Sequence, residues 1–242
     1  MSAESNNRLD AIPFLASLDA AALRDIEKRC RWRRCRAGEQ ILDKDSADSD
    51  VYFVVTGAMQ IVNYSLTGRE IAFAKLDAGS FFGELSAIDG APRSASVVAA
   101  QESLIAAMPA SLFTRLVTSE PEMAQHVLLR LAGIIRSCDE RIMDLSTLGA
   151  VQRVYLEIMR LAEESLPEDE AENSWAISPL PTHKAIASLA STTRETVARS
   201  MSQLVSGGII ERKGKTVLIC DFDRLERLAG ALGMEMDTDL SR

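Results

Sequence analysis

The chain has 242 residues and a formal net charge of −8, with 47% hydrophobic and 26% charged residues. This length accommodates two domains, each with its own core, and the composition is that of a globular protein rather than a disordered one. Charges interrupt every long apolar stretch before membrane-spanning length, and no basic start leads into an apolar run. We therefore expect a cytoplasmic protein with no membrane partner.

Residue types that bind metals or carry catalysis are scarce. The thiols and imidazoles are Cys30, Cys35, Cys138, Cys220, His126 and His183. None of the cysteines forms a C-x-x-C pair, so we expect no metal and interpret them as small apolar residues in a reducing compartment. A redox or iron–sulfur role is the alternative. We find no nucleophile–base arrangement and no glycine-rich P-loop, which argues against an enzyme.

Up to about Met108 the sequence alternates short β-branched runs with glycines. The runs span residues 51–55, 60–64 and 71–74, and glycines stand at positions 38, 57, 68 and 79. Short strands with glycine turns at this spacing predict a β-roll or jelly roll rather than an α/β sheet. A stretch of helical composition, Asp19 to Arg29, precedes them.

A dense basic run extends from Lys28 to Arg36 and holds one aromatic residue, Trp32. A nucleic-acid patch is one interpretation of such a run. We favour the other, a solvated strand edge whose charge prevents pairing with a second sheet, because no sheet-face aromatics accompany it.

Two short motifs follow one another near residue 90, namely Phe82-Gly83-Glu84-Leu85-Ser86 and Pro92-Arg93-Ser94-Ala95. Arg93 offers a planar fork of donors for phosphate oxygens, and Glu84 offers an acceptor for a ribose hydroxyl. Gly83 allows the backbone to approach a ligand closely, and a helical turn at residues 85–87 would direct free N–H groups at an anion.

This pair of motifs resembles the phosphate-binding cassette of cyclic-nucleotide-binding domains. The resemblance implies a bound cyclic nucleotide. The residues that it implies as ligand contacts are Phe82, Gly83, Glu84, Leu85, Ser86, Arg93, Ser94 and Ala95.

A long helix is predicted from about Pro121 to Leu148, with proline at an early helical position. Its apolar residues recur at alternating steps of four and three, which is an a/d seam. We interpret the seam as a two-helix dimer interface formed by Leu128, Leu131, Ile135, Cys138, Ile142 and Leu145. One helix packed on the β-roll is the alternative.

The C-terminal third has the order of a winged helix-turn-helix. Residues 182–201 read as helix, break and second helix, with Thr193 as a plausible N-cap, and a basic turn at 212–215 leads into a β-run. The segment from Thr182 to Cys220 contains six basic and two acidic residues, although the whole chain is acidic. Much of the acid lies in residues 163–172, which we interpret as a solvated connection.

The motif T-R-E-T-V-A-R at residues 193–199 closely resembles the recognition helix of the CRP/FNR family of regulators. Arg194, Glu195 and Arg199 occupy the family's base-reading positions, where arginine suits guanine and glutamate accepts from cytosine N4. The DNA contacts implied are Thr182, Thr193, Arg194, Glu195, Thr196, Arg199, Lys213 and Lys215. The half-site expected is TGTGA, repeated as an inverted palindrome with TCACA.

The resemblance covers the chain from about residue 36 to residue 219 and implies an α+β homodimer. Its expected parts are a β-roll sensor at 1–118, a dimerisation helix at 119–148 and a winged helix-turn-helix at 149–242. The implied function is transcription regulation controlled allosterically by a 3′,5′-cyclic nucleotide, with double-stranded DNA and RNA polymerase as partners. A redox-sensing or gas-sensing branch of the family is the alternative, but it needs an N-terminal cysteine cluster or a histidine in the β-roll.

The base of the nucleotide is predicted to be adenine. The family positions on the long helix that meet the base fall at about Cys138 and Asp139. A thiol accepts hydrogen bonds poorly, whereas the Asp139 carboxylate accepts from the adenine amine, or from guanine N1–H and N2 together. Ser94 does not decide between the two bases, because the resemblance implies that a hydroxyl residue after the cassette arginine occurs with either base. Cyclic AMP is favoured over cyclic GMP because the DNA-reading helix resembles the cyclic-AMP-responsive branch.

Overall fold

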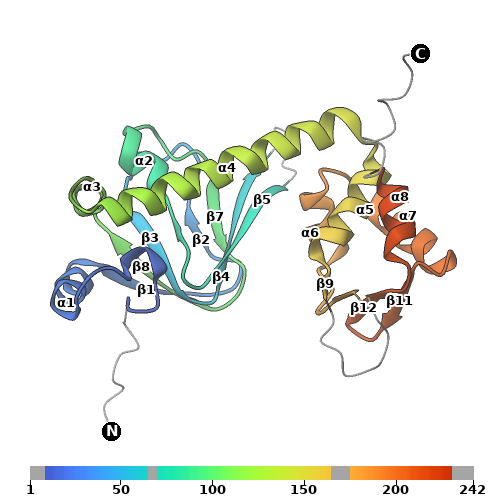
Figure 1. The fold of residues 1–242 in the computed structure, drawn as a ribbon, viewed down its shortest axis with the longest axis horizontal. Coiled ribbons are helices and arrows are strands. Elements are labelled where there is room, and N and C mark those ends of the chain that lie inside the picture. Colours follow the sequence, from blue (N-terminus) through green and yellow to red (C-terminus); the bar gives the residue numbers. More distant parts are fainter. Residues whose placement is uncertain (1–8, 65–69, 165–174, 231–242) are drawn as a thin grey trace, which may run out of the picture. The chain divides into compact units, whose positions relative to one another are not determined.

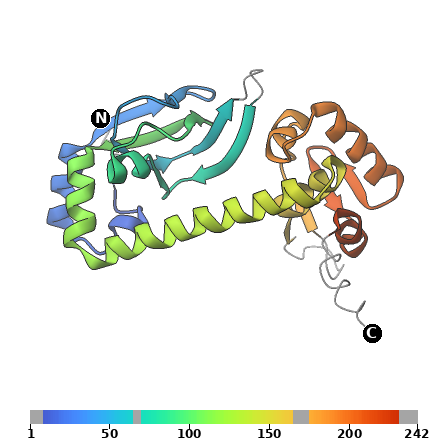
Figure 2. The ribbon, with the colours of Figure 1, turned by 90° about the horizontal axis from the view of Figure 1, so that it is seen from above.

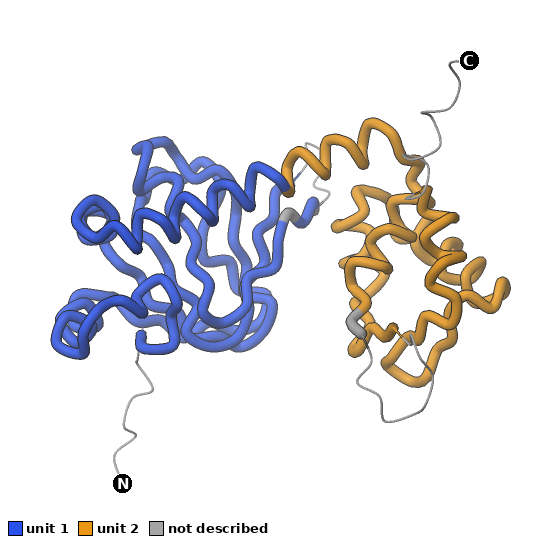
Figure 3. Tube along the Cα trace, viewed as in Figure 1, with its two compact units in different colours: residues 1–136 blue, residues 137–242 orange. Residues whose placement is uncertain are grey.

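The computed structural model describes residues 9–64, 70–164 and 175–230 (Figure 1). The chain divides into two compact units, residues 1–136 and 137–242 (Figure 3). Helix α4 (Pro121–Thr147) is one continuous helix that contributes to both units (Figure 2). Among the described residues, no helix combines the length and the apolar character needed to cross a membrane.

Residues 9–64 and 70–136 of the first unit form two four-stranded antiparallel sheets. One has the order β1 (Arg31–Cys35), β8 (Ser103–Met108), β3 (Val51–Thr56), β6 (Phe81–Phe82), and the other the order β2 (Gln40–Leu42), β7 (Ser96–Ala99), β4 (Ala58–Tyr64), β5 (Glu70–Asp77). The glycine between β3 and β4, Gly57, has φ +88°, and a Cβ there would lie 2.5 Å from the Glu102 carbonyl oxygen. The turn therefore requires glycine.

The hydrophobic pattern of these strands produces two cores. Side chains from both sheets, among them Val54, Met59 and Ile105, form one buried cluster. On the other side of the β1–β8–β3–β6 sheet, Phe14, Phe53 and further aromatic residues pack with residues of the flanking helices. The expected β-roll is confirmed, and β1 is an edge strand, as the charged run predicted.

Besides α4, the part of the first unit that the structure describes has four short helical segments. They are the 3-10 turn Pro13–Leu15, α1 (Ala20–Arg29), α2 (Glu84–Asp89) and α3 (Ala110–Ser119). Asp19 begins α1 by accepting hydrogen bonds from the amides of Ala21 and Ala22, both at 2.8 Å. The predicted helix at residues 19–29 therefore forms, with the aspartate as its N-cap.

In the second unit, the described residues after the end of α4 form four helices and a small sheet. The helices are α5 (Ala150–Leu161), α6 (His183–Leu189), α7 (Arg194–Ser206) and α8 (Phe222–Ala229). The sheet has the order β11 (Ile210–Lys213), β12 (Thr216–Ile219), β10 (Trp175–Ile177), β9 (Glu163–Glu164). The acidic stretch thus begins with a short strand, and its remainder, residues 165–172, lies outside the described residues.

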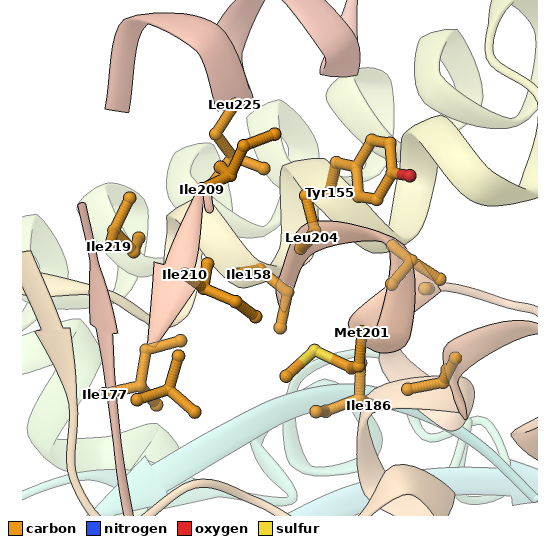
Figure 4. Packing of buried hydrophobic residues seen from close by; sticks show 14 of the residues in the cluster. Tyr155, Ile158, Ile177, Ile186, Met201, Leu204, Ile209, Ile210, Ile219 and Leu225 are labelled. Carbon is orange, nitrogen blue, oxygen red and sulfur yellow. The ribbon is translucent and has the colours of Figure 1, made fainter. Parts of the chain in front are cut away.

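One hydrophobic core holds the second unit together (Figure 4). Ile158 of α5, Ile186 of α6 and Met201 of α7 meet residues of the small sheet, and Ile158 and Ile186 are fully buried. The two helices of the predicted helix-turn-helix are therefore fixed on α5 by apolar burial. The expected boundaries at 118 and 148 stay an interpretation of the sequence.

Candidate ligand site and nucleic-acid interface

The cassette of the first unit begins at a glycine that has no room for a side chain. Gly83 follows β6, has φ +84° and is the N-cap of α2. A Cβ built there would lie 2.6 Å from Nη1 of Arg93 and 2.9 Å from the carbonyl oxygen of Asp50. The backbone at residue 83 is therefore in direct contact with the cassette arginine, whereas the sequence motif predicted a close approach to a ligand.

Arg93 is almost completely buried, with 2% of its surface exposed. Its Nη1 donates to the Gly83 carbonyl at 2.7 Å, and its Nη2 donates to the Asp50 carbonyl at 2.7 Å and to the carboxylate of Asp48. The face of the guanidinium lies over the Tyr52 ring, 5.8 Å from its centroid. Its Nε is buried and has no hydrogen-bond partner.

Glu84, the other charged residue of the cassette, is 4% exposed. It accepts a hydrogen bond from Nε of Arg130 at 3.2 Å, and the Arg130 guanidinium lies 4.7 Å from the centroid of the Phe81 ring. A buried carboxylate requires such a partner. The cassette thus contains the ion pairs Arg93–Asp48 and Arg130–Glu84.

The sequence pattern did not identify Arg130 or Asp48. Met123 and Val127 of α4 are buried in the first unit, and Leu131 packs partly against the same core. Arg130 lies one turn after Val127, so helical spacing from these apolar residues would have placed it on the inward face. Asp48 gives no comparable signal, because a loop between β2 and β3 brings it to Arg93.

The other cassette residues have different surroundings. Phe82 is buried and stacks on Tyr52 with ring centroids 5.2 Å apart. Ser86 is buried within α2, whereas Ser94 is exposed beside Arg93. Leu85 and Ala95 are half-buried. The structure therefore brings Gly83, Glu84 and Arg93 together and places Phe82 in the core behind them.

Helix α4 exposes a row of large apolar side chains. The exposed fractions are 66% for Leu128, 60% for Ile135, 61% for Ile142 and 48% for Leu145. Leu131 is different, because it is half-buried against the core of the first unit. A monomeric protein rarely leaves such a row in water.

Cys138 and Asp139, the positions expected near the base, are exposed on the part of α4 that belongs to the second unit. Neither side chain is engaged in the core of that unit. Both are thus accessible for contacts from outside the unit.

The helix-turn-helix begins each of its helices with a threonine. The hydroxyl of Thr182 accepts from the amide of Ala185, and the hydroxyl of Thr193 accepts from the amide of Thr196, both at 3.2 Å. Thr196 is buried, and its own hydroxyl pairs with that of Thr193 at 3.1 Å. This burial puts Thr196 in the packing of α7 rather than on its exposed side.

The exposed side of α7 carries the residues that were predicted to read bases. Arg194, Glu195 and Arg199 are all exposed. Glu195 and Arg199 are four residues apart and so share one face of the helix. A hydrogen bond from its own amide, and a further one with the Thr193 hydroxyl, hold the pKa of Glu195 below its usual range, so the carboxylate is an ionised acceptor at neutral pH.

The wing is the hairpin of β11 and β12, which turns at Gly214 with φ +65°. Lys213 and Lys215 are exposed at this turn. Beside the wing lies a groove of about 350 Å³, lined by residues 179–183, Arg212 and residues 214–217. Burial, and then the charges of Arg212 and Arg194, lower the pKa of His183 in this groove.

Comparisons with known proteins cover both units. The family description "Cyclic nucleotide-binding domain" matches residues 32–120, and "Crp-like helix-turn-helix domain" matches residues 152–228. The chain is 29% identical over 197 residues to the "Cyclic AMP receptor protein" of Thermus thermophilus, an alignment that covers 81% of this chain and 86% of that protein. The chain belongs to the CRP/FNR family.

Further relatives of this CRP/FNR protein also align over most of their length. The "CRP-like cAMP-activated global transcriptional regulator" of Mycobacterium tuberculosis is 26% identical over 192 residues, which cover 79% of this chain and 85% of that one. The solved structure of a CooA variant from Carboxydothermus hydrogenoformans has a TM-score of 0.73 at 20% identity, and covers 92% of this chain and 95% of that chain. At that identity the structural likeness concerns the fold.

Membership of the CRP/FNR family makes the chain a DNA-binding transcription regulator with a cyclic nucleotide-binding domain, and not an enzyme. The predicted family, the α+β fold class and the regulator class are therefore confirmed. The individual site residues stay predictions.

Replacement of Gly83 by alanine is expected to destabilise the first unit more than the same replacement at Gly90. Both residues have positive φ, which costs an L-residue about 1–2 kcal/mol, but a Cβ at Gly90 would meet no atom within 4 Å. Gly83→Ala adds a steric conflict with Arg93 and the Asp50 carbonyl, worth about 1–3 kcal/mol further. Urea unfolding of the two variants measures the difference. Equal decreases in the free energy of unfolding would contradict the close contact of residue 83 with Arg93 and the Asp50 carbonyl.

Proposed function

We propose that this chain is a cytoplasmic, homodimeric transcription regulator whose DNA binding is controlled by a 3′,5′-cyclic nucleotide, with cyclic AMP favoured over cyclic GMP. The observation that carries the effector class is the buried Arg93 with an unpartnered Nε. It lies beside the buried Glu84 and against Gly83, where no side chain fits. A buried guanidinium donor without a partner fits an anion that the protein itself does not supply.

The hydrogen-bonding groups of the site support a ligand that carries one phosphate and at least one hydroxyl. Each arginine is already paired with a carboxylate, Arg93 with Asp48 and Arg130 with Glu84, so it is the unpartnered Nε of Arg93, and not a net positive charge, that favours an anion. Arg93 would hold the phosphate through its free donor, because a planar guanidinium suits phosphate oxygens. When ionised, Glu84 accepts hydrogen bonds and donates none. It would accept from a ribose hydroxyl, so that Arg130 and the ligand share its carboxylate.

The exposed apolar row of α4 supports the homodimer. Ile135 and Ile142 are seven residues apart and each is about three-fifths exposed, which is the spacing of a two-helix seam. A dimer with a two-fold axis presents two recognition helices to two half-sites about one helical turn apart, so the DNA site would be palindromic. The motif at residues 193–199 favours a TGTGA-like half-site with TCACA in the inverted repeat.

The mechanism that we propose is a population shift. Contacts from the ligand to Glu84, Arg93 and α4 would stabilise the dimer arrangement in which both recognition helices reach successive major grooves. The ligand can shift this equilibrium only by its difference in affinity for the two arrangements.

The redox alternative has weaker support from the cysteines of the first unit. Burial raises the pKa of the Cys30 thiol to about 12, and burial also raises the pKa of the Cys35 thiol. The thiolate is the form that binds metals and reacts with oxidants, so neither residue is poised for such chemistry at neutral pH.

Arg93→Ala is expected to weaken cyclic-nucleotide binding by about 3–5 kcal/mol, because it leaves the phosphate without its charge partner. Arg93→Lys keeps a cation for Asp48 but lacks the planar fork, so it should retain the fold and still lose most of the affinity. Calorimetry gives the affinities, and thermal unfolding reports the fold. The control is Arg34→Ala at an exposed arginine of β1. Nucleotide binding by Arg93→Lys within a few fold of wild type would refute the cassette assignment.

Competition titrations with cyclic AMP, cyclic GMP and a cyclic dinucleotide are expected to rank cyclic AMP tightest. Asp139→Ala should then weaken cyclic AMP by about 1.5–3 kcal/mol, the range for a hydrogen bond to a charged acceptor. Glu140→Ala, at the next and equally exposed residue of α4, is the control. A preference for cyclic GMP that disappears in Asp139→Ala would reverse the choice of base.

Ile135→Glu is expected to dissociate the dimer, since two carboxylates would then face each other at an apolar seam position. Ser137→Glu adds the same charge at a neighbouring exposed position of α4 outside the proposed seam and should leave the dimer intact. Sedimentation equilibrium measures both variants. In the wild type, mild oxidation should link Cys138 to its copy across the axis. A tight dimer of Ile135→Glu would move the interface elsewhere.

Arg199→Ala is expected to lower affinity for the palindromic site by about 1–3 kcal/mol and to relax discrimination at one G·C pair. Lys215→Ala, on the wing, should weaken all DNA sequences about equally and reduce the salt dependence of binding by about one ion. Filter binding across a panel of single-base variants separates these two patterns. Selection of an asymmetric or unrelated site from random DNA would contradict the assignment.

A further inference from the structure

Two guanidinium groups converge on the carboxyl end of α6, at the turn that precedes the recognition helix. Nη2 of Arg141 donates to the carbonyl of Leu189 and to Oγ of Ser191, both at 2.9 Å. Nε of Arg153 donates to the carbonyl of Ala190 at 3.0 Å, and its Nη2 to the carbonyl of Ser191 at 3.3 Å. Three consecutive carbonyls of the turn thus accept from two arginines.

These contacts match what the end of a helix lacks. The last carbonyls of a helix have no partner within the helix, and the helix dipole favours a cation there. Ser191 has φ +50°, a conformation that non-glycine residues rarely adopt. The turn is therefore held in an uncommon backbone conformation by donors from outside α6 and α7.

The two arginines come from different helices, α4 and α5, which are themselves joined by polar contacts. Nη1 of Arg153 donates to the carbonyl of Leu148 at 2.7 Å. Arg160 of α5 forms an ion pair with Asp144 of α4 at 2.8 Å. The end of α4, the helix α5 and the turn of the helix-turn-helix are consequently connected by one set of hydrogen bonds.

Arg141 is the α4 residue of this set, and it lies on the same helix as the exposed apolar row. Its neighbours in sequence include Cys138 and Ile142, which are both exposed. Side-chain groups lie about 5–6 Å from a helix axis, so a rotation of α4 by about 10° moves the Arg141 guanidinium by about 1 Å. A shift of that size breaks a hydrogen bond or drags its acceptor along.

We propose that Arg141 and Arg153 form a clamp that transmits changes in α4 to the recognition helix α7. The clamp acts on the turn, whose angle sets the direction in which α7 leaves α6. Thr192, at the end of the turn, donates its amide to the Ala187 carbonyl at 2.9 Å, and Thr193 caps α7 directly after it. Arg141 and Arg153 are positioning residues in this proposal and make no contact with DNA.

The proposal rests on the proposed control of DNA binding by a cyclic nucleotide. The test uses Arg141→Met and Arg153→Met in the full-length chain, because methionine keeps an apolar stem without donors. Arg136→Met, at an exposed arginine on the same helix α4, is the matched control. The readouts are nucleotide affinity, DNA affinity with and without saturating cyclic AMP, and amide hydrogen exchange at residues 189–193.

Arg141→Met is expected to bind cyclic AMP as the wild type does and to keep its DNA affinity without nucleotide, while the increase in DNA affinity caused by cyclic AMP falls by about tenfold. Exchange at residues 189–193 should accelerate in both variants and stay unchanged in Arg136→Met. A purely structural role would lower DNA affinity equally with and without nucleotide. That result, or full stimulation by nucleotide in Arg141→Met, overturns the clamp.

The two levels of the proposal fail separately. A wild-type chain whose DNA binding responds to neither cyclic AMP nor cyclic GMP refutes the proposed effector. Hydrogen exchange still decides the clamp in that case, since unchanged exchange at the turn in Arg141→Met overturns it without reference to any nucleotide.

Discussion

The buried guanidinium of Arg93 is the constraint around which the candidate ligand site is built. A buried cation must be paired, and Arg93 obtains its partners from two separate segments, the loop that holds Asp48 and Asp50 and the glycine that begins α2. Backbone hydrogen bonds of residue 93 with residues 45 and 46 attach it to the same loop as Asp48. The positive φ and missing side chain of Gly83 follow from this arrangement, because the guanidinium occupies the space that a Cβ would need. The hydrogen bonds of Arg93 thus hold the loop of Asp48 and Asp50 against the glycine that begins α2.

Helix α4 makes different contacts at different positions along its length. Met123 and Val127 are buried in the first unit, and Arg130 on the same side pairs with Glu84. Further along, Ile135 and Ile142 remain exposed, and Arg141 holds the turn before the recognition helix. One continuous helix therefore carries a ligand-site contact, an unpartnered apolar row and a contact to the DNA-binding unit.

The recognition helix owes its presentation to two kinds of interaction. Apolar burial of residues such as Met201 and Leu204 fixes α7 on the core of the second unit. The Thr193 cap and the turn whose carbonyls accept from Arg141 and Arg153 fix where the helix starts. Because the inner face is used for packing, Arg194, Glu195 and Arg199 remain exposed on the outer face. The acidic net charge of the chain does not prevent this, since basic residues gather on the wing and the recognition helix.

The sequence by itself determined the family, the β-roll and the winged helix-turn-helix, because these depend on local motifs and on periodicity along the chain. It also identified β1 as a charged edge strand. The ligand contacts of the cassette and the base contacts of α7 stay predictions. Only the tertiary structure decided which residues complete the sites. Asp48 reaches Arg93 from 45 positions away, Arg130 reaches Glu84 because α4 turns one face to the first unit, Leu131 is drawn partly into that core, and Thr196 is buried rather than exposed. Each of these outcomes depends on contacts between segments distant in sequence, which local propensity and spacing do not encode.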